Sequence, residues 1–171
     1  MISRALQMLY DEHDVILKAI NKLQQLLKEN NLPTKTESLR SFIRFFQGYG
    51  DVFHHHKEEN TLFPLLTKKN EMLGMTIIEA LEEHHSEFRE TLLDISDALD
   101  KQDWETVTKE LGRYLSDLAD HISAENDELF VAAEMELTEE EKEKLYFDFL
   151  DQEMETGTEK KKEWEKQIDA L

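Results

Sequence analysis

The sequence predicts an all-α fold, an antiparallel up-down-up-down four-helix bundle with additional C-terminal helices. Three observations favour it. The 171 residues include only five glycines and two prolines, so sharp turns are few. Apolar residues recur in alternating steps of three and four, which is the spacing of a helix that faces a bundle core. Short links join these periodic segments, so consecutive helices should be antiparallel neighbours.

The first two predicted helices form one hairpin. The first runs from about residue 2 to residue 29, and its core-facing row is Ile2, Leu6, Leu9, His13, Ile16, Ile20, Leu23 and Leu27. Pro33 ends it, and Thr34 with Glu37 forms a candidate capping box for the second helix. The second helix should extend to Pro64, which kinks or ends it. Its core-facing row is Leu39, Ile43, Phe46, Gly50, His54, Glu58 and Leu62.

The next two predicted helices repeat this arrangement. The third runs from about residue 74 to residue 101, and its row is Ile77, Leu81, His84, Phe88, Thr91, Ile95 and Ala98. Asp103 is a candidate N-cap for the fourth helix. The row of the fourth helix is Val107, Leu111, Tyr114, Leu118, His121, Glu125, Leu129 and Ala132.

The remaining residues form a more highly charged C-terminal segment. We expect residues 1–136 to form the bundle and residues 137–171 to form a helical extension. Thr138 and Glu141 make a second candidate capping box, and Gly157 divides the extension into two amphipathic pieces. The extension should pack on the bundle or on a partner subunit, and the second arrangement would make a homodimer.

The charge and the residue types exclude several functions. The formal net charge of −19 repels phosphate backbones and anionic membranes and attracts small cations, so we expect no binding to nucleic acid or membranes. The chain has no cysteine, so any metal must be held by imidazole and carboxylate groups, as in iron, manganese or zinc sites. The N-terminal residues are acidic and lack an apolar run of signal-peptide length, so we expect a cytoplasmic protein.

An internal repeat selects candidate metal ligands. The segments HHHKEENTLF (54–63) and HISAENDELF (121–130) share the pattern H-x-x-x-E-x-x-x-L-F. The pattern selects His54 with Glu58, and His121 with Glu125. Residues four apart lie on one helical face, so each pair can converge on one metal ion or on two adjacent ions. His55 points roughly 100° away from His54 on an ideal helix.

The other two helices each supply one histidine. Glu12-His13 resembles Glu83-His84, and the apolar row of the third helix selects His84 over His85. Buried unpaired polar groups cost roughly 1–3 kcal/mol each and unpaired carboxylates cost several, whereas a cation gives all of them a partner. We therefore predict a buried metal centre. Its ligands are His13, His54, Glu58, His84, His121 and Glu125.

The order H, H-x-x-x-E, H, H-x-x-x-E over about residues 5 to 135 resembles the hemerythrin family in its bacterial HHE form. The resemblance implies an antiparallel four-helix bundle around a non-haem di-iron centre with a bridging oxygen species. It implies that Glu58 and Glu125 bridge the two irons and that the four histidines are terminal ligands. Oxygen-carrying members have a further histidine one turn before the position of His84, where this chain has Ala80.

The missing fifth histidine leaves one ligand open. His55 or a tyrosine could supply it, and otherwise His55, His56 and His85 are expected to be solvated. We expect a metal-binding protein rather than an enzyme, one that binds or senses oxygen, peroxide or nitric oxide. Manganese or zinc could replace iron. The alternatives are an iron storage or delivery protein, a peroxidase-like or catalase-like di-iron enzyme, and a structural bundle without metal.

Overall fold

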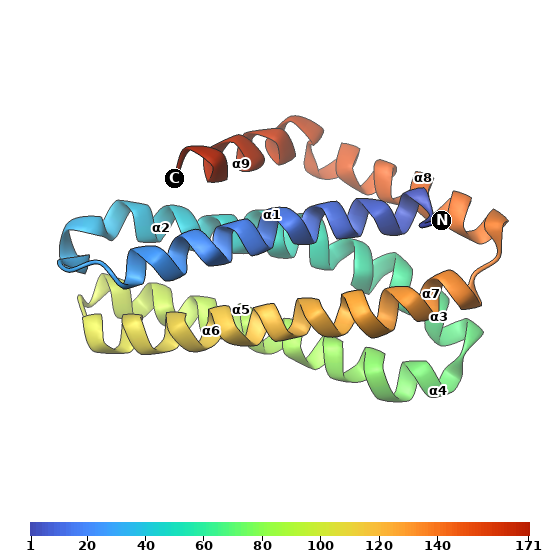
Figure 1. Cartoon of the computed structure of the whole chain (residues 1–171), viewed down its shortest axis with the longest axis horizontal. Coiled ribbons are helices and arrows are strands. Elements are labelled where there is room, and N and C mark those ends of the chain that lie inside the picture. Colours follow the sequence, from blue (N-terminus) through green and yellow to red (C-terminus); the bar gives the residue numbers. More distant parts are fainter.

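The computed structural model describes residues 1–171, and all of its regular structure is helical. Four long bundle helices run alternately up and down along the long axis of the molecule (Figure 1). The predicted all-α bundle with additional C-terminal helices is confirmed. None of the helices combines the length and the apolar character that crossing a membrane requires.

Three of the four bundle helices consist of several segments. The first is a single α-helix, α1 (Arg4–Leu27). The second contains α2 (Thr36–Phe45), η2 (Phe46–His55), η3 (Glu58–Leu62) and α3 (Phe63–Lys69). The third contains α4 (Glu71–Leu73), η4 (Gly74–Ile78) and α5 (Glu79–Asp100). The fourth contains α6 (Trp104–Ala124), η5 (Glu125–Leu129) and α7 (Phe130–Glu136). Pro64 follows directly after the π segment η3, and the second helix continues beyond it to Lys69, so the helix does not end at Pro64.

The segments η2, η3, η4 and η5 are π-helical. A π turn closes its hydrogen bonds on the fifth residue, so it holds more residues than an α turn and changes the direction of the side chains around it. Three π segments coincide with the predicted ligands, because η2 ends at His55, η3 begins at Glu58 and η5 begins at Glu125. Near the predicted site, the α-helical repeat alone therefore does not identify every side chain that faces inward.

Two of the three predicted helix caps are confirmed. The Asp103 side chain accepts a hydrogen bond from the backbone N–H three residues later (3.2 Å). The Thr138 capping box is complete. The box predicted at Thr34 is wrong, because its hydroxyl donates to the Asn31 carbonyl oxygen (2.8 Å) and a short 3-10 turn, η1 (Leu32–Lys35), precedes α2.

The apolar core has two parts. A cluster of 22 buried residues, which includes Ile20 and Phe46, fills one end of the bundle. A second cluster of 15 buried residues, which includes Leu6 and Phe63, fills the other end. In every bundle helix, buried histidine or glutamate side chains lie between the positions that contribute to the two clusters. The bundle therefore contains one buried polar layer near its middle.

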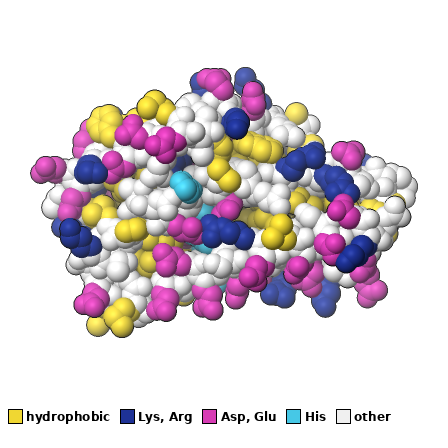
Figure 2. Space-filling view, turned by 180° about the vertical axis from the view of Figure 1, so that it is seen from behind, with side chains coloured by type: hydrophobic (Ala, Val, Ile, Leu, Met, Phe, Trp, Pro, Cys, Tyr) yellow, Lys and Arg dark blue, Asp and Glu magenta, His cyan; other side chains and the backbone are white.

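The C-terminal helices α8 (Glu139–Thr156) and α9 (Thr158–Ala170) lie along α1 on one side of the bundle (Figure 1). Leu145 and Phe149 of α8 belong to the 15-residue cluster, and Ile168 of α9 belongs to the 22-residue cluster. Gly157 separates the two helices at φ 104°, a backbone conformation that favours glycine. The extension thus packs on the bundle of its own chain. Acidic side chains are spread over the face shown in Figure 2, in keeping with the net charge of −19.

Candidate metal centre

The buried polar layer contains two groups of side chains that could each hold a metal ion. The first group is His13, His54, Glu58 and Glu125. The second group is His55, His85 and His121. Within each group the ligand atoms lie within 4.8 Å of one another, and every member is buried. All four bundle helices contribute, so the layer is formed only when the bundle is assembled.

The two glutamates connect the two groups. Glu125 directs Oε2 at His13 Nε2 (3.1 Å) in the first group and Oε1 at His121 Nε2 (3.0 Å) in the second. Glu58 directs Oε1 at His54 Nε2 (3.4 Å) in the first group and Oε2 at His85 Nε2 (3.5 Å) in the second. Each carboxylate therefore presents one oxygen to each group of histidines, which is the arrangement of a carboxylate that bridges two cations.

Six of the inward atoms have no hydrogen-bond partner. They are His13 Nε2, His54 Nε2 and both carboxylate oxygens of Glu58 and of Glu125. A buried polar atom left in this way costs roughly 1–3 kcal/mol, and a buried carboxylate costs more. Metal ions would give all six a partner, because each atom offers a lone pair. The chemistry of the donors fits the same reading, since imidazole with carboxylate suits first-row transition metals.

The Nδ1 atoms of the buried histidines face away from the candidate metal positions and have hydrogen-bond partners of their own. His54 Nδ1 donates to Glu12 Oε2 (2.8 Å). His85 Nδ1 donates to Glu59 Oε1 (2.8 Å). His13 Nδ1 meets Asn126 Oδ1 (2.6 Å), and His55 Nδ1 meets Asp51 Oδ1 (3.3 Å). An oxygen acceptor at Nδ1 keeps the proton there and leaves the Nε2 lone pair facing inward, as in metal-binding histidines. His121 Nδ1 lies 3.2 Å from Nδ1 of His84.

The carboxylates give the layer a strong preference for positive charge. Burial lowers the pKa of His54, but the nearby carboxylates, Glu58 first, raise it to about 10. Burial also lowers the pKa of His85, yet the neighbouring carboxylates, Glu125 first, raise it to about 9. Burial would raise the pKa of Glu125, but the imidazoles around it hold that pKa well below its usual range. A cation can take the place of these protons, so metal binding here should release protons.

Five of the six predicted ligands converge in this layer, and His84 does not. The prediction that the third helix turns His84 inward is wrong, because His84 is exposed and His85 is fully buried. Leu81 and Phe88 are buried and fit either choice. Leu92 decides between them, since it is buried and lies seven residues after His85. The buried row is Ile78, Leu81, His85, Phe88, Leu92, Ile95 and Leu99, and Ala98 beside it is buried as well. This row is more apolar than the predicted row and could have been recognised in the sequence.

His55 is the second ligand candidate that the repeat does not select. It lies in η2, whose π-helical turns bring both His54 and His55 to the inside, whereas a helix of 3.6 residues per turn would separate them. The His55 ring stacks on the ring of His85, with centroids 3.7 Å apart. His56 is exposed and contacts the Asn60 amide. No tyrosine belongs to either group of candidate ligands.

Comparison with known proteins agrees with this site. Residues 4–133 match the family model described as the Hemerythrin HHE cation binding domain, and residues 76–170 match it a second time. The first match covers more than half of the chain. No curated protein and no solved structure matches the chain.

Proposed function

Because the chain belongs to the hemerythrin family of HHE cation-binding domains, we propose that its buried layer holds two iron ions and binds or senses a small ligand: oxygen, peroxide or nitric oxide. One observation carries the proposal. Glu58 and Glu125 each direct one oxygen at each group of histidines, so two adjacent cations would share both carboxylates.

The two positions offer different numbers of protein ligands. The position beside His55, His85 and His121 would have three imidazoles and one oxygen from each carboxylate. The position beside His13 and His54 would have two imidazoles and the other two carboxylate oxygens. The second position therefore has one protein ligand fewer and is the better place for an external ligand. Two iron ions would supply one-electron redox chemistry and an open coordination position.

Apolar rings restrict access to the layer. Phe130 stacks on His13 with ring centroids 5.2 Å apart. Phe88 meets the ring of His121 edge to face at 5.2 Å, and Phe63 stacks on His85 at 5.7 Å. These rings leave little room for bulk water, which favours small ligands and slows loss of the metal.

Iron loading tests the proposal. We expect two iron ions per chain by elemental analysis, and a visible spectrum that differs between reduced protein and protein exposed to air or nitric oxide. Glu125→Ala should reduce the iron content, because it removes both bridging contacts of that carboxylate. Glu128→Ala is the matched control, since Glu128 lies exposed in the same segment η5 and should leave the iron content unchanged.

The outcomes separate the proposal from its alternatives. Iron below one ion per chain in the unmodified protein, or a spectrum that no ligand changes, would contradict it. Rapid transfer of the iron to a chelator without reaction with oxygen would support storage or delivery instead. Sustained peroxide turnover that His54→Ala abolishes would support an enzyme.

A further inference from the structure

We propose that Glu12 is a positioning residue for His54 and that the C-terminal helices hold Glu12 in place through Glu153 of α8 and Lys161 of α9. This inference rests on the metal centre proposed above. It gives the C-terminal helices a part in metal binding, although neither of them contributes a candidate ligand.

Glu12 connects the metal layer to a buried group of charges. Its side chain is 1% exposed, and Oε2 accepts the hydrogen bond from His54 Nδ1 (2.8 Å). Oε1 accepts a hydrogen bond from the ammonium group of Lys57 and forms a salt bridge with Lys161 Nζ at 2.9 Å. Both lysines also contact the carboxylate of Glu153, with Lys57 Nζ 2.8 Å from Oε1. Two carboxylates and two ammonium groups thus form a balanced cluster of four charges, which we call the Glu12 cluster.

Packing alone does not explain the Glu12 cluster. Burying charges costs several kcal/mol for each ion, and apolar side chains of similar volume often stabilise a fold equally well or better. The cluster differs from an ordinary ion pair because one of its oxygens holds the outer nitrogen of a candidate ligand. A carboxylate at Nδ1 fixes the tautomer and the ring orientation, so that Nε2 faces the metal.

His54 is the only candidate ligand whose outer partner is held by the C-terminal helices. The partner of His85, Glu59, is held by Arg89 of α5 (2.8 Å). The partner of His13 is Asn126, which lies within η5. A shift of α8 or α9 should therefore disturb the position with two histidines before it disturbs the position with three.

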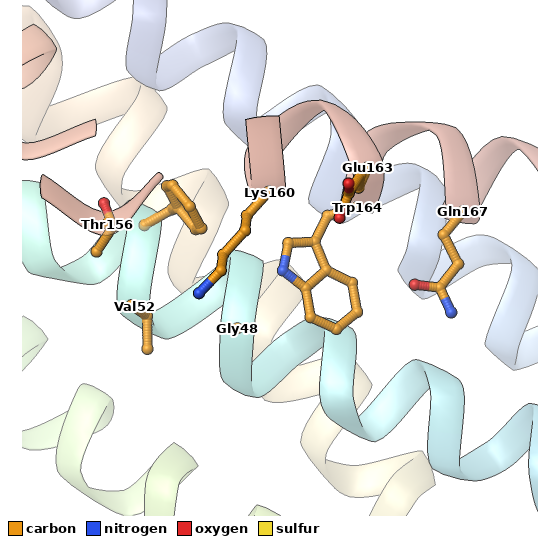
Figure 3. A pocket seen from close by; sticks show the side chains of 8 residues that line it. Gly48, Val52, Thr156, Lys160, Glu163, Trp164 and Gln167 are labelled. Atoms are coloured by element: carbon orange, nitrogen blue, oxygen red, sulfur yellow. The ribbon is translucent and has the colours of Figure 1, made fainter. Parts of the chain in front are cut away.

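Helix α9 also sits directly on η2, the segment that carries His54. Figure 3 shows the Trp164 indole lying over the backbone at Gly48. Both residues line a surface cavity of about 460 Å³. A Cβ at Gly48 would lie 2.8 Å from Trp164 Cζ2, so this contact requires glycine. Next to it, the Tyr49 hydroxyl donates to Glu165 Oε1 of α9 (2.9 Å). Helix α9 thus contacts the segment that carries His54 directly, in addition to its contact through the Glu12 cluster.

Zinc provides a test that does not depend on iron chemistry, because it accepts imidazole and carboxylate ligands. The full chain and two variants are loaded with zinc, and the zinc dissociation constants are measured by chelator competition. Lys161→Met should weaken the binding of one of two zinc ions and leave the binding of the other unchanged. The weakening should not exceed about 10–100-fold, the effect of losing an outer partner, because Glu12 itself remains beside His54. Lys162→Met is the matched control, because Lys162 is exposed on the same helix and contacts only Glu159.

Nitrogen-15 NMR of the histidines in the zinc-loaded protein supplies a readout that a general loss of stability would not change. In the unmodified protein, His54 should be protonated at Nδ1. In Lys161→Met the His54 signals should shift or broaden, while the signals of His85 and His121 stay in place.

A second pair of variants moves α9 without changing any charge. Gly48→Ala should displace Trp164 and weaken the binding of the same zinc ion. Gly50→Ala is the control and should leave zinc binding unchanged, since a Cβ at Gly50 meets no atom within 4 Å. If Lys161→Met and Gly48→Ala bind both zinc ions as tightly as their controls, the part of the C-terminal helices in metal binding is refuted while the metal centre stands. If the unmodified chain binds no zinc and no iron, the metal centre itself is refuted and this inference falls with it.

Discussion

Replacing His55 by alanine should weaken metal binding strongly, whereas replacing its neighbour His56 should not. His55 is 5% exposed, stacks on His85, and shares a group of candidate ligand atoms with His85 and His121. His56 is exposed and contacts only the side chain of Asn60. The pair compares adjacent histidines of one helix that differ in their direction.

The magnitude follows from the role of the ring. Loss of an outer partner of a metal ligand typically weakens metal binding 10–100-fold, so loss of the ligand itself should exceed about 100-fold, or about 2.7 kcal/mol. At about 2–4 °C for each kcal/mol in a domain of this size, the metal-loaded protein should melt roughly 5–11 °C lower. An exposed side chain such as His56 should change the free energy of unfolding by at most about 0.5 kcal/mol.

The assay measures metal dissociation constants by competition with a coloured chelator and melting temperatures by circular dichroism, at matched free metal. Equal dissociation constants for the His55 and His56 variants would refute the inward direction of His55. A larger loss for the His56 variant would show that the π-helical turns of η2 are misplaced.

Three further predictions concern other parts of the chain. His85→Ala should weaken metal binding by more than about 100-fold. His84→Ala should weaken it by at most about 10–100-fold, because His84 reaches the layer only through His121. The same competition assay measures both variants, and a larger loss for His84→Ala would support His84 as the ligand, as predicted from the sequence. Removing the metal with a chelator should lower the free energy of unfolding by at least about 4 kcal/mol. The six buried atoms then lose their partners at roughly 1–3 kcal/mol each, and protonation and water recover only part of this loss. Calorimetry should show a melting point at least roughly 8–16 °C lower, and an unchanged melting point would indicate a bundle that needs no metal. Asp103→Ala should cost about 1 kcal/mol through loss of the N-cap of α6 and leave metal affinity unchanged, so a change in affinity would show that the cap influences the distant layer.

The sequence is sufficient to predict the bundle and most of the buried layer. Apolar residues at steps of three and four locate the four bundle helices, and the H-x-x-x-E repeat identifies His54, Glu58, His121 and Glu125. These predictions succeed because they depend on local spacing. The prediction that His13 faces inward is confirmed for the same reason, since α1 is a regular α-helix without π turns.

The remaining features depend on information that local spacing does not contain. His55 turns inward because η2 is π-helical. His85 is the exception, because local spacing does select it over His84 through the apolar row of α5 that contains Leu92 and Leu99. The contact between Glu12 and Lys161 joins residues 149 positions apart in the chain, and only the packing of α9 on the bundle brings them together.

The number and position of the metal ions can be measured directly by anomalous diffraction from crystals of the iron-loaded protein. We expect two iron peaks roughly 3–4 Å apart, the usual separation in two-metal sites, with the carboxylates of Glu58 and Glu125 between them. One peak should lie beside His13 and His54, and the other beside His85. A single peak, or iron bound only by carboxylates on the surface, would contradict the two-ion centre.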